Sequence, residues 1–406
     1  MDPAPTLLLT LAGPDRPGVT AALFGILGDD DVEVADIEQV VVRGRLLLGV
    51  LLRLGDRADA AAIADRAEVT ATSLGMALDV VPGSAETGGR RRSSLRVTVI
   101  GSPLRPDAVA ALARRAAEVG ANIDRIARVA AYPVTAIELD VSGSDDAVAL
   151  RAALSDSAAT CGVDVAVQAV GLDRRGRHLL VMDVDSTLIQ DEVIELLAGH
   201  AGQEPAVADI TARAMRGELD FAASLHARVA LLAGLPASVL DAVREQVRLT
   251  PGARTLVRTL QRLGYRVALV SGGFTQVVEP VAADLGITDL RANELEVVDG
   301  RLTGRVVGPV VDREGKAQAL LDFAALHAIP LSRTIAVGDG ANDLDMIAVA
   351  GLGIAFNAKP VVRQAADAAV STPYLDSVLY LLGITREEIE EADARDGVAT
   401  PAPPVR

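Results

Sequence analysis

Two carboxylates at the end of an apolar run are the first sign of chemistry in this sequence. The run Leu179–Met182 is followed by Asp183 and Asp185, with Thr187 two residues further on. An apolar run of this kind predicts a buried strand, and open α/β sheets bind ligands at the carboxyl ends of their strands. Asp is also frequent in ordinary turns, so the pair alone fits a site or a turn.

Two later segments offer groups that suit a phosphate. A second apolar run ends in Ser271, Gly272 and Gly273, which supply a hydroxyl and bare backbone N–H groups for anionic oxygens. Lys316 lies at the start of a predicted helix. Each segment alone has a plain alternative, an ordinary strand-to-helix turn for the first and a solvated side chain for the lysine.

A third apolar run ends in acidic and amide side chains. Asp339, Asn342 and Asp343 follow Ile335–Gly338. Carboxylate and amide oxygens gathered with glycine at a strand end make a plausible site for a hard divalent cation.

These segments need a sheet to bring them together. Strands are expected at His178–Asp183, Arg266–Ser271 and Thr334–Gly338, with helices between them. The βα alternation predicts an α/β fold with a doubly wound, Rossmann-like parallel sheet covered on both faces. Asp191–Leu256 shows helical stretches and no strand pattern, which indicates a helical insertion after the first strand.

The order β-α-β-β-α-β occurs twice before this region. The first copy has strands at Thr6–Ala12, Val32–Val42, Leu46–Leu54 and Leu78–Val81 and helices at Val19–Leu27 and Ala58–Ala77. The second has strands at Leu95–Ile100, Asn122–Ala130, Val134–Val141 and Val163–Val170 and helices at Pro106–Val119 and Asp145–Cys161. Each copy predicts a ferredoxin-like sandwich.

The expected organisation is therefore two small domains and one large one. The boundaries are a first domain at 1–82, a linker at 83–94, a second domain at 95–171, a catalytic domain at 172–392 with its helical insertion at about 189–256, and a disordered tail at 393–406.

Composition excludes several classes of protein. Of the 406 residues, 39 are Lys or Arg and 55 are Asp or Glu, and the net charge of −16 argues against nucleic acid as a partner. No apolar stretch approaches the length of a membrane span, and the N-terminus lacks the basic region of a signal peptide. The single Cys161 cannot form an internal disulfide, and the four histidines lack zinc-ligand spacing. A cytoplasmic protein is expected.

The four segments together resemble the motifs of the haloacid dehalogenase (HAD) superfamily phosphatases, in the same order and at comparable spacing. Within it the match is close to the phosphoserine phosphatase family and covers about Arg177–Glu390. The two upstream repeats are similar to ACT domains, which sense small molecules and often accompany amino-acid enzymes. Tandem ACT domains before such a phosphatase resemble the mycobacterial and related actinobacterial form.

The resemblance implies Mg²⁺-dependent hydrolysis of O-phospho-L-serine to L-serine and phosphate, the last step of serine biosynthesis. Asp183 is the implied nucleophile, forming an aspartyl-phosphate, and Asp185 the general acid and later base, which requires a raised pKa. The implied metal ligands are the Asp183 carboxylate, the Asp185 main-chain carbonyl and Asp339, with Asp343 holding a metal-bound water.

The resemblance also implies a set of substrate contacts. Ser271, the Gly272 N–H and Lys316 would compensate the phosphoryl oxygens, and Asn342 would orient the phosphate or Lys316. In the insertion, or cap, Glu192 would pair with the substrate ammonium and Arg228 with its carboxylate. Met215 and Phe221 would form an apolar lid.

A regulatory ligand site is implied in the first repeat. Gly13, Asp15 and Gly18 belong to the turn where ACT domains bind amino acids. The matching turn of the second repeat, Gly101–Pro106, lacks the Asp-Arg-Pro-Gly sequence, which puts a second equivalent site in doubt. The resemblance implies a homodimer with serine as a feedback ligand, and the charge and the lack of a membrane-span-length apolar stretch leave neither nucleic acid nor a membrane as an expected partner.

Two alternatives stay open at this point. A HAD phosphatase with the same nucleophile can act on another small phosphate ester or on a phosphoprotein. An amino-acid sensor with a degenerate phosphatase domain is the other, and the four intact motifs argue against it.

Overall fold

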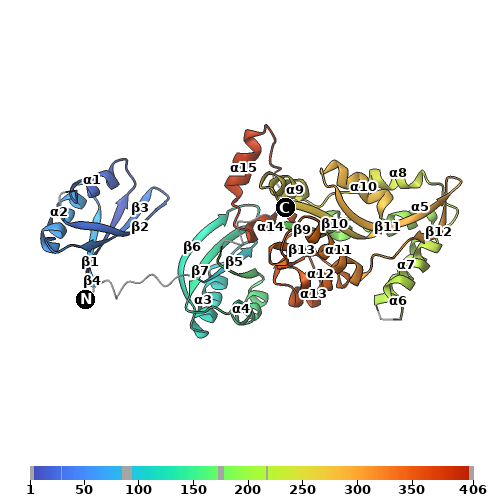
Figure 1. Ribbon diagram of the computed structural model, residues 1–406, viewed down its shortest axis with the longest axis horizontal. Helices are drawn as coiled ribbons and strands as arrows, with labels where there is room; N and C mark the ends of the chain where they lie inside the picture. Colours follow the sequence, from blue (N-terminus) through green and yellow to red (C-terminus); the bar gives the residue numbers. More distant parts are fainter. Residues whose placement is uncertain (1–3, 29, 85–93, 172–177, 216–217, 402–406) are drawn as a thin grey trace. The chain divides into compact units, whose positions relative to one another are not determined.

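The computed structural model describes residues 4–28, 30–84, 94–171, 178–215 and 218–401. The chain divides into two compact units, Met1–Arg92 and Ser93–Arg406 (Figure 1). Among the described residues, no helix is both long enough and apolar enough to cross a membrane.

The first unit is a four-stranded antiparallel sheet with two helices packed on one of its faces. Its strand order is β2-β3-β1-β4. Alternate residues of β3, from Leu46 to Leu52, are buried under the helices, as period-two alternation predicts. Its elements are β1 (Pro5–Pro14), α1 (Val19–Gly25), β2 (Val32–Val42), β3 (Arg45–Leu54), α2 (Ala60–Ser73) and β4 (Ala77–Ser84).

The second unit begins with a sheet of the same topology, in the order β6-β7-β5-β8. The βαββαβ order expected from the sequence is thus present in both copies. The elements of this copy are β5 (Leu95–Gly101), α3 (Pro106–Glu118), β6 (Asn122–Ala130), β7 (Thr135–Ser142), α4 (Ala147–Cys161) and β8 (Asp164–Ala169).

A seven-stranded sheet follows, in the order β12-β11-β10-β9-β13-β14-β15. All neighbours pair in parallel except β11 and β12, which form an antiparallel hairpin at one edge. The strands are β9 (Leu179–Asp183), β10 (Arg266–Phe274), β11 (Asp289–Val298), β12 (Arg301–Val307), β13 (Thr334–Gly338), β14 (Leu352–Phe356) and β15 (Ala368–Val370). Because β10 and β13 flank β9, the order reverses at β9, where open α/β sheets bind ligands.

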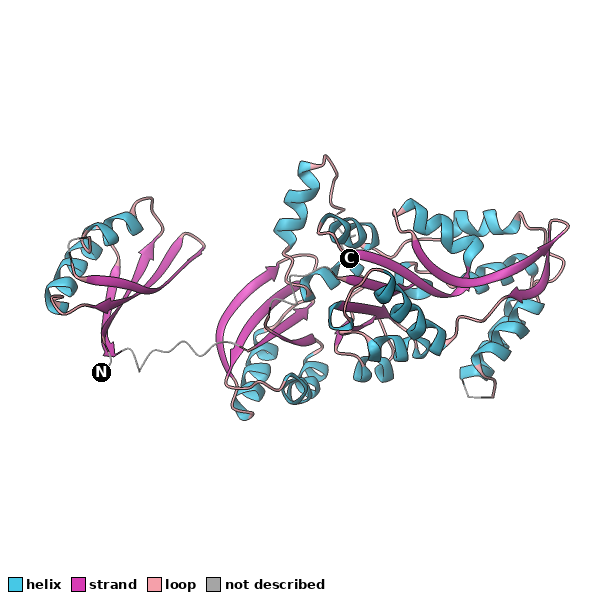
Figure 2. Cartoon of the chain, viewed as in Figure 1, coloured by secondary structure: helices cyan, strands magenta, loops and turns pink. Residues whose placement is uncertain are grey.

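Both faces of this sheet are covered, which explains its continuous apolar strands. Leu180 and Met182 belong to one buried cluster, whereas Leu179 and Val181 belong to another on the opposite face. Figure 2 shows helices on both sides of the strands. The helices are α9 (Ala253–Arg262), α10 (Thr275–Asp284), α11 (Arg313–Leu326), α12 (Leu344–Val349), α13 (Pro360–Ala365), α14 (Val378–Leu381) and α15 (Arg386–Arg395).

Four helices form the expected insertion after β9, which we call the cap. They are α5 (Val193–Ala201), α6 (Glu204–Met215), α7 (Phe221–Ala230) and α8 (Val239–Gln246). The chain enters and leaves the cap side by side, because Ile189 bridges Leu249 and the Thr250 N–H donates to the Leu188 carbonyl at 2.9 Å. Two adjacent chain segments therefore connect the cap to the sheet.

The second βαββαβ domain is packed against the large sheet domain. Asp164 accepts hydrogen bonds from the backbone N–H and the hydroxyl of Ser371, at 2.7 and 2.8 Å. Arg151 forms an ion pair with Asp367 at 2.6 Å. Residues of this small domain, including Ala166, also share a buried apolar cluster with the large domain.

The predicted tail boundary is wrong. Asp393 lies in α15, its side chain is fully buried, and it accepts a hydrogen bond from Arg258 at 2.9 Å and forms an ion pair with Arg262. Thr400 also donates to Asp393, at 2.8 Å. The Ala- and Pro-rich composition of this segment gives no indication of such long-range charge pairing.

One further boundary differs from expectation. The strand β4 continues to Ser84, past the expected domain end at 82, because Gly83 pairs with Thr6. The rest of the predicted linker, apart from Ser94, and residues 172–177 and 402–406 lie outside the described residues.

Candidate active site

The two carboxylates after β9 face one site because the chain turns sharply there. Asp183 ends the strand, and Ser186 has a φ of 58°, a left-handed conformation within the loop. The Asp185 carboxylate accepts from the Val193 N–H at the start of α5 and from the Ser271 hydroxyl, both at 2.9 Å. One acidic side chain thus links β9, β10 and the cap. Burial raises the pKa of Asp185, which is the direction that a general acid requires.

Lys316 is a buried partner of two carboxylates rather than a solvated side chain. Its Nζ lies 2.7 Å from Oδ1 of Asp183 and 2.7 Å from Oδ1 of Asp343, and none of its surface is exposed. Burial favours the neutral amine, but the charges of Asp183 and Asp343 outweigh it and raise the pKa of Lys316. The ammonium therefore stays charged at the base of the site.

Three carboxylates beside this lysine suit a divalent cation. Oxygens of Asp183, Asp339 and Asp343 lie within 4.8 Å of one another, and they are the only such group among the described residues. Burial, followed by repulsion from Asp343, raises the pKa of Asp183 well above its usual range and that of Asp339 to about 6. With Lys316 counted, the ionised group carries two uncompensated negative charges. An oxygen-ligated divalent ion would balance them.

Two glycines of the second motif leave room for neighbouring side chains of the site. A Cβ on Gly273 would lie 2.7 Å from Oδ2 of Asp185, and one on Gly272 would lie 3.0 Å from Cζ of Phe221. The missing side chain at Gly273 lets the Asp185 carboxylate lie close to β10, and the one at Gly272 leaves room for an aromatic ring of the cap against the strand.

The cap supplies the opposite wall of the site. The Ser186 hydroxyl donates to Glu192 at 2.7 Å, and burial together with the Asp185 charge raises the pKa of Glu192 to about 7. Arg228 is half-buried, its Nε donates to the Ser224 carbonyl at 3.3 Å, and burial lowers its pKa.

One cavity of about 470 Å³ joins the two walls. Its lining includes Asp183, Asp185, Glu192, Phe221, Arg228, Gly272, Asp339 and Asn342, all predicted from the sequence. Ser271 and Lys316 lie behind this lining as the buried partners of Asp185 and Asp183, and Asp343 pairs with Lys316 there. The side chain of Met215 lies outside the described part of the chain.

The sequence analysis missed several residues of this site. Asn293 is buried and donates to the Gly272 carbonyl at 2.8 Å, while its Oδ1 accepts from the Val311 N–H at 2.8 Å. It lies in β11, a strand the sequence pattern did not reveal. Further cavity residues that were missed are Glu195, Thr211, Ser224 and Lys359. A tally of charged residues near strand ends could have found Lys359, which follows β14.

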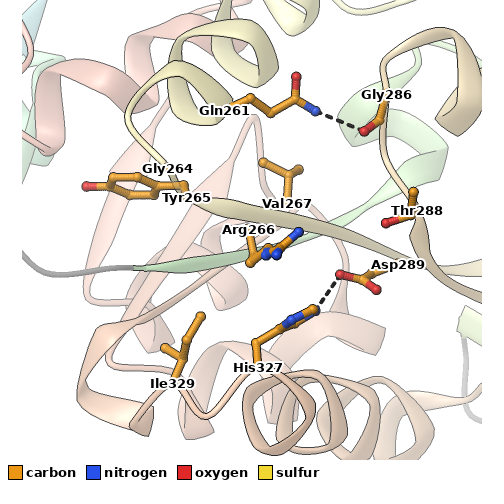
Figure 3. Close-up of a pocket in the computed structure, with 10 residues that line it drawn as sticks. All are labelled: Gln261, Gly264, Tyr265, Arg266, Val267, Gly286, Thr288, Asp289, His327 and Ile329. Carbon is orange, nitrogen blue, oxygen red and sulfur yellow. Dashed lines mark hydrogen bonds and ion pairs between the residues drawn. The ribbon is translucent and has the colours of Figure 1, made fainter.

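A second cavity of about 470 Å³ lies at the opposite edge of the sheet. It is lined by residues near the starts of β10 and β11, and Figure 3 shows His327 directed at Asp289, 2.6 Å away, and Gln261 directed at the Gly286 carbonyl. Two of its side chains, His327 and Gln261, are thus already paired within the protein. Size therefore does not identify the reactive site, whereas the carboxylate cluster does.

The turn expected to bind a regulatory ligand lies between β1 and α1. Gly13 is in the last part of β1, and Gly18 precedes α1 with a φ of 95°, which favours glycine. The Asp15 N–H donates to the Gly44 carbonyl at 2.8 Å, which fixes the turn to the β2–β3 hairpin.

Comparisons with known proteins agree with this architecture. The family model for a haloacid dehalogenase-like hydrolase matches residues 180–348, and two models described as ACT domain match residues 5–81 and 93–168. The phosphoserine phosphatase of Streptomyces coelicolor is 59% identical over 389 residues, covering 96% of this chain and 95% of that protein. The phosphoserine phosphatase SerB2 of Mycobacterium tuberculosis is 54% identical over 395 residues, covering 96% of each.

A solved structure extends the agreement to the fold. The unliganded probable phosphoserine phosphatase from Vibrio cholerae is 34% identical, with a TM-score of 0.58, over 74% of this chain and 90% of that one. The fold, the site and these matches define a phosphatase of the haloacid dehalogenase class, with two ACT domains ahead of it. The chain belongs to the phosphoserine phosphatase family.

Proposed function

We propose that this enzyme hydrolyses O-phospho-L-serine to L-serine and phosphate, the last step of serine biosynthesis. The observation that carries the proposal is that one cavity has Asp183, the proposed nucleophile, at one wall and Glu192 and Arg228 at the other. Phosphoserine has an ammonium for Glu192 and a carboxylate for Arg228, besides its phosphate. The names of the similar proteins support the same substrate.

The reaction divides into two steps at Asp183. A carboxylate oxygen of Asp183 attacks phosphorus, the bond from phosphorus to the serine oxygen breaks, and Asp185 gives its proton to that oxygen. Water then attacks the aspartyl-phosphate while Asp185 takes a proton from it, which releases phosphate and restores both carboxyl groups. The raised pKa of Asp185 suits this role, because the group must be protonated before the first step.

The transferring phosphoryl group needs positive charge and N–H donors around it. Lys316 supplies the charge, and the Gly272 N–H and the Ser271 hydroxyl supply donors at the end of β10. Ser271 donates to Asp185 in this structure, so it would exchange that bond for one to the phosphate. Asn342 lines the same cavity and would orient the phosphate.

Mg²⁺ is the proposed cofactor. The carboxylates of Asp183 and Asp339 and the main-chain carbonyl of Asp185 would hold it, with Asp343 beside them holding a water ligand. The bound ion supplies charge neutralisation between two anionic reactants. The uncompensated charge of the carboxylate cluster supports this choice.

The cap would exclude water from the reaction. The Phe221 ring already lies against Gly272, and Met215 is proposed as its apolar companion. The paired chain segments beside Ile189 and Leu249 would act as the hinge.

We further propose that serine binds at the Gly13, Asp15 and Gly18 turn and regulates the enzyme as a homodimer. The ACT-domain match and the left-handed Gly18 support this. Titrating serine against activity, with Asp15→Ala as the comparison, tests it, and identical titration curves for the two proteins would contradict this site.

Phosphate release from purified protein tests the catalytic proposal. Phosphoserine is compared with phosphothreonine, glycerol phosphate and an aryl phosphate, with Mg²⁺ and with EDTA, beside Asp183→Asn. Metal-dependent turnover that prefers phosphoserine and disappears in the variant is expected. Turnover of the other esters but not of phosphoserine would overturn the cap assignment, and no turnover at all would favour a sensor.

A further inference from the structure

Lysine is rare in this chain and gathers at one place. Of its 39 lysines and arginines, only Lys316 and Lys359 are lysines. Lys316 lies at the base of the reaction cavity as the buried partner of Asp183, and Lys359 is part of the cavity lining. Lysine carries a compact point charge that can meet an anion from many directions, whereas arginine favours a planar, two-point contact. The location of both lysines suggests that the cavity needs this kind of charge.

The backbone of Lys359 is fixed while its side chain is free. The residue follows β14 and directly precedes Pro360, which holds it in an extended conformation with φ −64° and ψ 155°. Its carbonyl accepts hydrogen bonds from the N–H groups of Val362 and Arg363, at 3.0 and 3.1 Å. Its ammonium has no hydrogen bond or ion pair with any residue that the structure describes, and the side chain is exposed. The ammonium of Lys359 thus lies at a fixed position of the chain and is unpaired among the residues that the structure describes.

The cavity has an excess of negative charge. Its lining contains five carboxylates and two cations: Asp183, Asp185, Glu192, Glu195 and Asp339 against Arg228 and Lys359. Arg228 is half-buried among these acids, and Glu192 and Asp185 are its strongest charged neighbours. Within the described lining, Lys359 is therefore the exposed cation that an approaching anion meets.

We propose that Lys359 captures the phosphate ester: its ammonium draws the anionic substrate into the carboxylate-lined cavity and pairs with the phosphate before the cap closes. An exposed charge near a site acts mainly on association and is screened by salt. Lys359 would therefore affect kcat/KM and KM more than kcat. The inference rests on the proposed phosphatase function, but it requires only a dianionic ester and not phosphoserine in particular.

The test compares Lys359→Gln with Arg363→Gln. Arg363 is an exposed cation one turn along α13 that lines a different cavity, so the two variants change the net charge equally. With phosphoserine at low salt, K359Q should lower kcat/KM on the order of fivefold, the effect of one unit charge a few Å away in water. The kcat/KM of K359Q should depend less steeply on ionic strength than that of the wild type, and Lys359→Arg should restore most of the wild-type dependence. The inhibition constant of inorganic phosphate should rise by a similar factor.

Two outcomes would overturn the proposal. Equal losses in K359Q and R363Q would mean that only the overall charge matters, and a fall in kcat as large as that in kcat/KM would mean a role in the chemical step. The same comparison with an aryl phosphate separates the two proposals. If the wild type turns over the aryl ester but not phosphoserine, the proposed substrate fails while the role of Lys359 is still measured.

Discussion

The ammonium nitrogen of Lys316 lies 2.7 Å from the carboxylate oxygen Oδ1 of Asp183, and both side chains are buried. Burial alone would protonate the carboxyl group and weaken it as a nucleophile. The lysine opposes this effect at the carboxylate proposed as the nucleophile. The proposed nucleophile and its counter-charge come from β9 and α11, which are far apart in the sequence.

Replacing Lys316 by methionine keeps the length of the side chain but removes this charge. We expect kcat for phosphoserine to fall by about 10²–10³-fold, as for other lost transition-state contacts. Phosphate release at saturating substrate measures it. Thermal unfolding is the control for folding, and a folded K316M with nearly full kcat would contradict the role.

Metal and pH should act together on stability. The raised pKa values of Asp183 and Asp339 mean that the metal-free native protein binds more protons than the unfolded chain, whose carboxyl groups titrate near 4. Metal-free stability should therefore fall as the pH rises from about 4 through about 6, where Asp339 titrates. Mg²⁺ binds the ionised form, so the increase in melting temperature with Mg²⁺ should grow over this same pH interval. Asp339→Asn should reduce that increase, and an increase independent of pH would count against the proposed site.

Selection of the substrate ammonium should depend on the ionisation of Glu192. Its pKa of about 7 means that the carboxylate becomes available as the pH rises through neutrality. KM for phosphoserine should therefore fall between pH 6 and 8 relative to KM for glycerol phosphate, which lacks an ammonium and has a similar phosphate titration. Initial rates across this range give the ratio. Glu192→Gln should remove the pH dependence of this KM ratio. A ratio that still changes with pH in this variant would mean that another group causes the change.

The three strands that carry the motifs could be predicted because burial on both faces makes them continuous apolar runs. Expected Thr334–Gly338 agrees with β13, and β9 begins one residue after the expected start. Their polar ends then indicated Asp183, Ser271 and Asp339. Local composition was sufficient to predict these strands, because burial on both faces of the sheet requires apolar residues along their whole length.

The missed residues depend on contacts that no local pattern contains. Asn293 acts through the Gly272 carbonyl and the Val311 N–H, which lie 21 and 18 residues away in the chain. The burial of Asp393 depends on guanidinium groups more than 130 residues earlier. Very short strands rich in Ala, such as β15, also lack the bulky apolar run that identified β9.

Contact between cap and strand can be tested at Gly272. A methyl group there would lie 3.0 Å from Cζ of Phe221, so Gly272→Ala should push the ring, and with it the cap, away from β10. We expect kcat/KM to fall by about tenfold or more, as displacement of a positioned group does. Phe221→Leu in the same chain removes the collision and should recover part of the loss. Equal losses in the single variant G272A and the double variant would show that the ring is not the obstacle.

The second ACT domain should contribute to the stability of the phosphatase domain. Asp164 is buried and accepts both the backbone N–H and the hydroxyl of Ser371. Asp164→Ala leaves both donors without this partner, which costs about 1–3 kcal/mol for a buried group. Denaturant unfolding of the full chain measures the free energy of unfolding. Asp164→Asn retains an acceptor oxygen and should lose less, whereas equal losses would indicate that the carboxylate charge matters more than the hydrogen bonds. Asp145→Ala is the matched surface control, because its exposed carboxylate lies in the same domain and has no hydrogen bond to the phosphatase domain among the described residues.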